Sequence, residues 1–213
     1  MNIAIITGAS SGLGREFALQ ICQNYASEID EIWLLARRKE PLLALAQEIS
    51  ATGICVGAAM PMDITDEEQM KDFQDKLDIE APTVKYLVNA AGLAKIGGPF
   101  TLQPEELTHM IDLNCKAAVH MTAICMPHFD KDSRILQICS TAGFQPMQGL
   151  NVCRIQSIST PLQSGTSLGI DWKTDLCDSG LPVLDQRYRI YRCCKRYRQP
   201  KSSSCRTSLS TGF

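Results

Sequence analysis

The sequence predicts an α/β protein, built on a doubly wound parallel sheet of five strands with covering helices, truncated, and followed by an irregular C-terminal tail. Two observations indicate this fold class. Short apolar runs alternate with segments of helical periodicity through the first 150 residues, which is typical of a parallel sheet covered on both faces. A glycine-rich turn follows the first apolar run, and nucleotides bind at such turns in sheets of this kind.

The elements follow one another in a regular order. Expected strands are short and rich in Ile, Val and Leu, and they cover residues 3–7, 31–36, 54–59, 84–89 and 134–139. Expected helices run from 12 to about 25, over 41–50 and from a cap at Asp66 to about 77. Another helix starts at Pro104 and is followed by a long apolar helix through Asn114 to about 127. Right-handed crossovers between these strands then predict a Rossmann-type sheet.

Composition excludes several classes of protein. Of the 213 residues 45% are apolar and the net charge is −2, which is typical of a globular chain and gives no reason to expect nucleic-acid or membrane-surface binding. No apolar run approaches a membrane span, and the N-terminus has no basic leader, so we expect a cytoplasmic location. The ten cysteines form no Cys-x-x-Cys pair and share no ligand spacing with the three histidines, so we expect reduced thiols and no metal.

The chain changes character near residue 150. Residues 1–150 contain 11 Lys and Arg against 19 Asp and Glu, whereas residues 151–213 contain 10 against 4. The first part has 18 alanines and 10 glutamates, and the last 63 residues have neither residue type. Because Ala and Glu are strong helix formers, the tail has lost most of its helix signal. We therefore expect two regions, 1–152 as the folded domain and 153–213 as a tail.

The glycine-rich turn runs from Thr7 to Gly14, between the first strand and the first helix. Its glycines permit a tight turn and a close approach of the backbone to a phosphate, while the helix N-terminus offers free amides. The spacing differs from that of a Walker loop and the Walker lysine is missing. A glycine-rich turn without any ligand is the alternative.

The Thr-Gly-x-x-x-Gly-x-Gly pattern resembles the signature of the short-chain dehydrogenases/reductases, and the resemblance covers residues 1–152. It implies a dinucleotide site made of Gly8, Ser10, Ser11, Gly12, Leu13, Gly14, Asp63, Ile64, Asn89, Ala90, Ala91 and Gly92. It also implies a catalytic asparagine at Asn114 and a catalytic serine at Ser140. The alternative roles are a strand-end cap for Asn89, a buried polar group for Asn114 and a turn residue for Ser140.

The cofactor preference is read at the end of the second strand. An acid there would bind the ribose hydroxyl of NAD, whereas an arginine suits the 2′-phosphate of NADP. The segment from Ala36 to Lys39 has no acid and contains Arg37 and Arg38, so we expect NADP rather than NAD. The resemblance points to Arg37 as the phosphate contact. A solvated basic entry to the next helix is the alternative.

The sequence departs from the family at its catalytic pair. The resemblance implies carbonyl–alcohol interconversion by hydride transfer, with a tyrosine as acid/base thirteen residues after the serine and a lysine four residues later. These positions hold Cys153 and Ser157, and neither side chain can replace its counterpart. The pairs Tyr191–Lys195 and Tyr197–Lys201 have the right internal spacing but lie far along the tail, so we interpret them as coincidence.

A shifted reading frame explains the departure. Codons permitted for residues 153–159, with two bases restored after the first T, read Tyr-Ala-Ala-Ser-Lys-Ala-Phe, which contains the missing pair at the expected place. Permitted codons for the residues beyond then give an amphipathic helix and an apolar strand in order. We therefore hypothesise that residues 153–213 are the product of a frameshift, by mutation or by sequencing error.

Three functional hypotheses follow. The first is an NADP-dependent oxidoreductase of this family, acting on a small carbonyl or alcohol, that is inactive in the present chain because the Tyr/Lys pair is absent. The second is a non-catalytic dinucleotide-binding remnant or pseudoenzyme. The third is a basic tail that binds nucleic acid or an acidic partner, which we rank last. The resemblance also implies a homodimer or homotetramer interface, which we expect to be lost with the altered tail.

Overall fold

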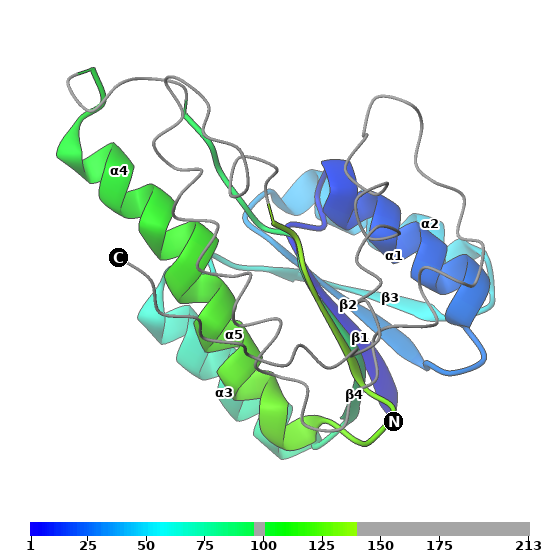
Figure 1. Cartoon of the computed structure of the whole chain (residues 1–213). Coiled ribbons are helices and arrows are strands. Elements are labelled where there is room, and N and C mark those ends of the chain that lie inside the picture. The colour runs from blue at the N-terminus through cyan, green and yellow to red at the C-terminus, as the bar shows by residue number, and fades with distance from the viewer. Residues whose placement is uncertain (96–100, 140–213) are drawn as a thin grey trace, which may run out of the picture. The chain divides into compact units, whose positions relative to one another are not determined.

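The computed structural model describes residues 1–95 and 101–139, and these form one parallel five-stranded sheet in the order β3-β2-β1-β4-β5 (Figure 1). Its strands are β1 (Asn2–Thr7), β2 (Glu31–Ala36), β3 (Val56–Pro61), β4 (Thr83–Asn89) and β5 (Arg134–Gln137). This arrangement confirms the predicted Rossmann-type fold class. The predicted tail lies outside the described residues.

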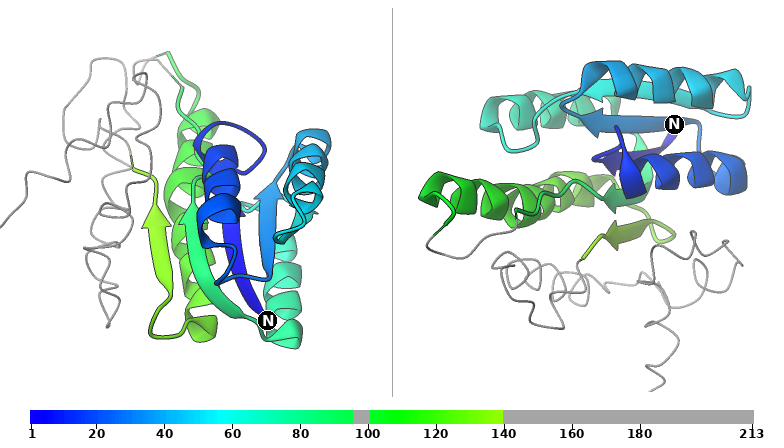
Figure 2. Two further views of the ribbon diagram at one scale, coloured as in Figure 1. Left: turned by 90° about the vertical axis from the view of Figure 1, so that its right-hand side faces the viewer. Right: turned by 90° about the horizontal axis from the view of Figure 1, so that it is seen from above.

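The helices cover both faces of the sheet. They are α1 (Gly12–Tyr25), α2 (Lys39–Ala51), α3 (Glu67–Glu80), α4 (Pro104–Ile111), the π-helical turn η1 (Asp112–Lys116), α5 (Ala117–Cys125) and the 3₁₀ turn η2 (Met126–His128). Figure 2 shows α1 and α2 on one face and α3 and α5 on the other. This is the arrangement expected when right-handed crossovers lead outward from β1 to β3 and then back to β4 and on to β5.

The central strands are buried on both faces, which explains their continuous apolar runs. On β1, Ile3 and Ile5 join Trp33 and Leu35 of β2 in the core beneath α3 and α5. The alternate residues Ala4 and Ile6 are also fully buried. Because both sets of side chains are out of solvent, the strand pattern shows no polar alternation.

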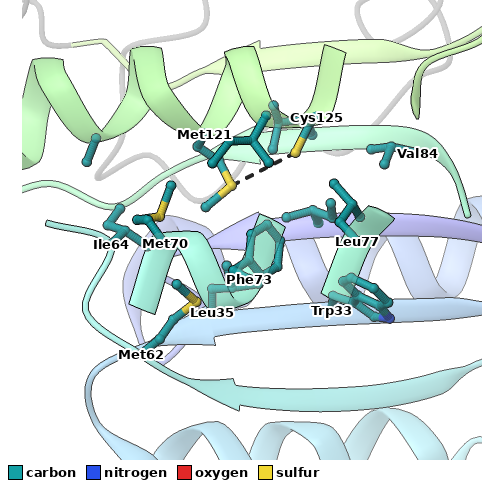
Figure 3. Close-up of a cluster of buried hydrophobic side chains, with 14 of the residues drawn as sticks. Trp33, Leu35, Met62, Ile64, Met70, Phe73, Leu77, Val84, Met121 and Cys125 are labelled. Atoms are coloured by element: carbon teal, nitrogen blue, oxygen red, sulfur yellow. Dashed lines mark hydrogen bonds between the residues drawn. The ribbon is translucent and has the colours of Figure 1, made fainter. Parts of the chain in front are cut away.

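The core beneath α3 is drawn in Figure 3. Met70, Phe73 and Leu77 recur at helical spacing and are all buried. The Phe73 ring meets the edge of Trp33 with a centroid distance of 6.1 Å, a geometry that aromatic pairs prefer. Met121 of α5 closes the cluster from the neighbouring helix.

The N-terminus of α3 has the predicted cap. The Asp66 carboxylate accepts hydrogen bonds from the backbone N–H groups of Glu68 and Gln69, each at 3.0 Å. These bonds satisfy two of the amides that a helix leaves free at its start.

The third strand was predicted two residues too early, because it begins at Val56 and not at residue 54. Gly53 adopts a left-handed conformation with φ 69°, and Ile54 is 57% exposed. The β-branched Ile54 therefore belongs to the turn that leaves α2. The fifth strand also ends earlier than expected, at Gln137.

The helical segment predicted from Pro104 to about 127 consists of several elements. One π-helical turn separates α4 from α5, and a 3₁₀ turn ends the segment. The π-helical turn was not predicted, because such a turn has no distinct signal in apolar periodicity.

Two features are absent from the part of the chain that the structure describes. Within residues 1–95 and 101–139, no helix is both long and apolar enough to cross a membrane. Across the same ranges, no three His, Cys, Asp or Glu side chains lie close enough together to hold a metal ion.

Leu77 and Ile79 provide a matched test of the packing beneath α3. Leu77 is fully buried, whereas Ile79 on the same helix is 83% exposed. We expect Leu77→Ala to lower the free energy of unfolding by roughly 2–5 kcal/mol, because it removes buried methyl groups and leaves a cavity. Ile79→Ala should change it by less than about 0.5 kcal/mol. Urea titration of both variants measures the difference, and equal losses would contradict this packing.

Candidate functional site

The candidate site lies where the strand order reverses. β1 pairs with β2 on one side and with β4 on the other, because the chain runs from β1 outward to β2 and β3 and then crosses back to β4. The loops after these strands meet at one edge of the sheet. Ligands of doubly wound sheets bind at this point.

Each glycine of the first loop meets a different constraint. Gly8 has φ 68°, and a Cβ there would lie 2.7 Å from the Cα of Ala91. A Cβ at Gly14 would lie 2.5 Å from the carbonyl oxygen of Gly8, so the helix start can pack on the loop only without a side chain. Gly12 has φ 57°, and a Cβ there would meet no atom within 4 Å. The loop therefore closes tightly on the sheet side and stays open on the other.

Thr7 holds this loop against the end of β4. Its Oγ1 accepts hydrogen bonds from the backbone N–H groups of Ala90 and Ala91, each at 3.1 Å. Thr7 is 1% exposed. The loops after β1 and β4 are therefore joined by one buried hydroxyl, a role that the sequence pattern did not predict.

The start of α1 differs from the start of α3. Its N-cap Ser11 has extended backbone and makes no side-chain hydrogen bond to the helix amides, and the first turn has no acidic residue. α3 instead has its Asp66 cap and two acidic residues in its first turn. The amides of α1 are thus left for another acceptor, and the helix dipole there favours an anion.

The two arginines after β2 have different partners. The Arg38 guanidinium donates from Nη2 to Ser10 Oγ at 3.1 Å and to Ser11 Oγ at 2.5 Å. Arg37 places its Nη1 3.7 Å from an oxygen of Asp63. The resemblance to the family favoured Arg37 as the phosphate contact, but it is Arg38 that lies against the glycine-rich loop.

Asp63 is held in its ionised form at the end of β3. Its partial burial acts to raise the pKa of the carboxyl. Two hydrogen bonds from Thr65, with the charges of Arg37 and His109, act in the other direction and lower the pKa below its ordinary value. The next residue, Ile64, is buried in the core, so the backbone at this position is fixed.

Asn89 belongs to a buried polar network at the end of β4. Its Nδ2 donates to Thr122 Oγ1 at 3.1 Å, and Gln137 Nε2 donates to the same oxygen at 2.9 Å. Asn89 Oδ1 is buried and has no hydrogen-bond partner within the described residues. Thr122 and Gln137 come from α5 and β5, and nothing in the sequence pattern singled them out.

Asn114 sits in the π-helical turn η1 and is 6% exposed. Its Oδ1 accepts from the Leu93 backbone N–H at 2.9 Å, and its Nδ2 donates to the Leu93 carbonyl oxygen at 2.7 Å. The amide therefore fixes the backbone that follows Gly92, at the same edge of the sheet. π-Turns inside helices are frequent at functional sites.

The structure thus brings the predicted cofactor residues to one edge of the sheet, with Asn114 beside them. Three predicted positions are not placed, because Ser140, Cys153 and Ser157 lie outside the described residues.

Comparison with known proteins identifies the family of the chain. The sequence pattern of the short chain dehydrogenases matches residues 2–152. A short chain dehydrogenase from Pseudocercospora fijiensis is 31% identical over 150 residues, which cover 67% of this chain and 46% of the relative. A very-long-chain 3-oxoacyl-CoA reductase from Aspergillus clavatus is 34% identical over 152 residues, covering 67% and 41% of the two chains. The chain thus spans less than half the length of these curated relatives.

Solved structures show the same fold. A short-chain dehydrogenase from Sphingobium yanoikuyae in complex with NADPH superposes with a TM-score of 0.68 at 28% identity, covering 78% of this chain and 64% of the other. A metagenomic short-chain oxidoreductase in complex with NADP gives 0.67 at 26% identity, covering 77% and 74%. From the pattern match over most of its length, the chain belongs to the short chain dehydrogenase family.

Proposed function

We propose that this chain binds NADP(H) at the carboxyl edge of its sheet and descends from an oxidoreductase that interconverts a carbonyl and an alcohol. The observation that carries the proposal is the Arg38 guanidinium against Ser10 and Ser11, beside an uncapped helix. The NADPH and NADP in the two related solved structures support the same cofactor. The segment from Ala36 to Lys39 has no acid that would select NAD instead.

The residues present fit a dinucleotide. The open side of Gly12 and the uncapped amides of α1 would hold the pyrophosphate. Arg38 would bind the 2′-phosphate through its planar fork, and Asp63 with Ile64 would contact the adenine. The segment Asn89, Ala90, Ala91 and Gly92, which Thr7 and Asn114 hold in place, would line the nicotinamide side.

The catalytic half of the site is incomplete. The cofactor, when bound, supplies or accepts the hydride. Ser140 would polarise the substrate carbonyl and Asn114 would support proton movement, but Cys153 and Ser157 stand where a tyrosine and a lysine are required. Positioned acid–base catalysis contributes roughly 10²–10⁴-fold to rate. We infer that the present chain binds cofactor with little or no turnover, which also describes a non-catalytic dinucleotide-binding remnant.

The proposal also covers the location, the substrate class and the oligomeric interface of the protein. It includes a cytoplasmic location, which the thiols of Cys22, Cys55 and Cys125 support. It also includes a small carbonyl or alcohol as substrate, and the loss of the homodimer or homotetramer interface.

We further propose that residue 152 ends the original reading frame. The family match stops at residue 152, one residue before the tyrosine position, which supports the frameshift hypothesis. The loss of Ala and Glu beyond residue 150 supports it independently.

Sequencing the coding DNA across codons 148–160, with an intact-mass measurement of the protein, tests the frameshift. We expect an overlapping frame that encodes Ala-Ala-Ser-Lys directly after the first base of codon 153, and a tyrosine codon there once the two missing bases are present. DNA that cannot encode Ala-Ala-Ser-Lys at this place would contradict the hypothesis. An intact mass that matches the printed sequence would assign the shift to the gene, and a different mass would assign it to the sequencing.

Arginine substitutions test the cofactor proposal. We expect Arg38→Ala to weaken NADPH binding roughly 10- to 100-fold, because it removes charge-assisted hydrogen bonds to a phosphate. NADH has no 2′-phosphate, so its binding should change less than about threefold. Fluorescence titration of both reduced cofactors measures the two affinities.

Two neighbouring substitutions are matched controls. Lys39→Ala removes a charge from the same segment and should have a small effect. Arg37→Ala should cost less than Arg38→Ala, because the Arg37 guanidinium pairs with Asp63. A larger loss for Arg37→Ala, or an equal loss of NADH binding in Arg38→Ala, would contradict the assignment.

A further inference from the structure

Two buried cysteines lie in contact away from the cofactor site. The Sγ atom of Cys55 is 2.9 Å from the Sγ atom of Cys22. Cys22 lies in α1 and is 1% exposed, and Cys55 immediately precedes β3 and is 6% exposed. A disulfide bond has a length of about 2.05 Å, so a shift of less than about 1 Å would join the sulfur atoms.

The backbone around Cys55 is fixed on both sides. The Ile54 N–H donates to Thr52 Oγ1 at 3.3 Å, and the Val56 N–H donates to the carbonyl oxygen of Asp30 at 3.1 Å. The Thr52 hydroxyl also lies 3.6 Å from the Cys22 sulfur. These bonds keep the two thiols together in the folded protein, which raises their effective concentration for a reaction with each other.

The same backbone offers a route for an oxidant. Residues 51–54 are exposed, and Gly53 has a left-handed conformation that an unpacked turn tolerates. Opening of this short turn would uncover Cys55 without unfolding α1. Turns with few buried contacts open at low free-energy cost compared with the core.

We propose that Cys22 and Cys55 form a reversible disulfide when the protein meets a hydroperoxide. The proposal rests on the position of the two sulfur atoms and does not depend on cofactor binding. It assigns a modification site to the junction of α1 and β3.

The reaction balances in two steps. The Cys55 thiol attacks the hydroperoxide, takes one oxygen atom to become a sulfenic acid and releases an alcohol, or water where the oxidant is hydrogen peroxide. The Cys22 sulfur then attacks the sulfenic sulfur, the disulfide bond forms, and one water leaves with the thiol proton. Overall the two thiols lose two electrons, and the peroxide oxygen–oxygen bond is reduced.

Burial sets the rate of this reaction. Loss of solvent, followed by the hydrogen bond and charge of Cys22, raises the pKa of the Cys55 thiol from 9.0 to about 12. Because the thiolate is the nucleophile, the closed protein reacts slowly, and oxidation requires opening of the turn. We therefore expect a response to sustained exposure to peroxide and not to a brief pulse.

Peptide mapping of the full chain tests the proposal. Trypsin places Cys22 in the peptide 16–37 and Cys55 in the peptide 40–71, and each peptide holds one cysteine. After hydrogen peroxide treatment we expect these peptides joined, lighter than their sum by two hydrogen atoms, and separated again by dithiothreitol. The melting temperature should rise by roughly 5 °C or more, because the bond constrains the unfolded chain.

Controls make the result specific. Cys22→Ser should abolish the joined peptide and the rise in melting temperature, while Cys125→Ser, which alters another buried cysteine, should retain both. When the chain is unfolded in urea before peroxide treatment, Cys55 should form disulfides with many different cysteines. Recovery of Cys22 and Cys55 as separate thiols or sulfinic acids in the folded wild-type chain would overturn the proposal. Pairing of Cys55 mainly with a cysteine other than Cys22 would also overturn it. Both of these outcomes are measured on the wild-type chain, so they do not depend on whether the variants fold.

Discussion

The ends of β1 and β4 lie so close together that a side chain at position 8 would place its Cβ 2.7 Å from the Cα of Ala91. This close contact requires glycine at position 8. The buried hydroxyl of Thr7 holds the two loops together by accepting hydrogen bonds from the backbone amides of Ala90 and Ala91. The cofactor site depends on this close approach to β4. Without it, the glycine-rich loop could not adopt its tight turn, and α1 could not start in its observed direction. Gly14 extends the constraint to the start of the helix, which packs directly on Gly8.

The binding and catalytic parts of such a site come from different stretches of chain, so one can persist without the other. Cofactor binding relies on loops whose ends are fixed by the sheet, and these lie within the described residues. In the proposed function, the tyrosine and lysine of proton transfer would come from beyond β5, where the sequence has Cys153 and Ser157. Asn114 is the exception among the proposed catalytic residues, since it lies in the sheet domain and makes two hydrogen bonds to the Leu93 backbone there.

Most of the fold could be predicted because buried strands and helix periodicity are local signals in this chain. The loop glycines were predicted for the same reason, since a turn and a close approach restrict the residue type. Local pattern could not distinguish Arg37 from Arg38, because their partners come from loops distant in sequence. Nor could it find the π-helical turn at Asn114 or the sharing of Thr122 by two amides, which depend on how distant elements pack.

The central claim is that this chain retains its cofactor site but not its catalysis. The direct measurement is one sample of the full chain titrated with NADPH and then mixed with an excess of ketone, with the absorbance of the reduced nicotinamide followed for hours. The account predicts saturable binding and oxidation at least roughly 10²-fold slower than in a reductase of the family that has both the tyrosine and the lysine. Absence of binding, or oxidation at the rate of that reductase, would contradict it.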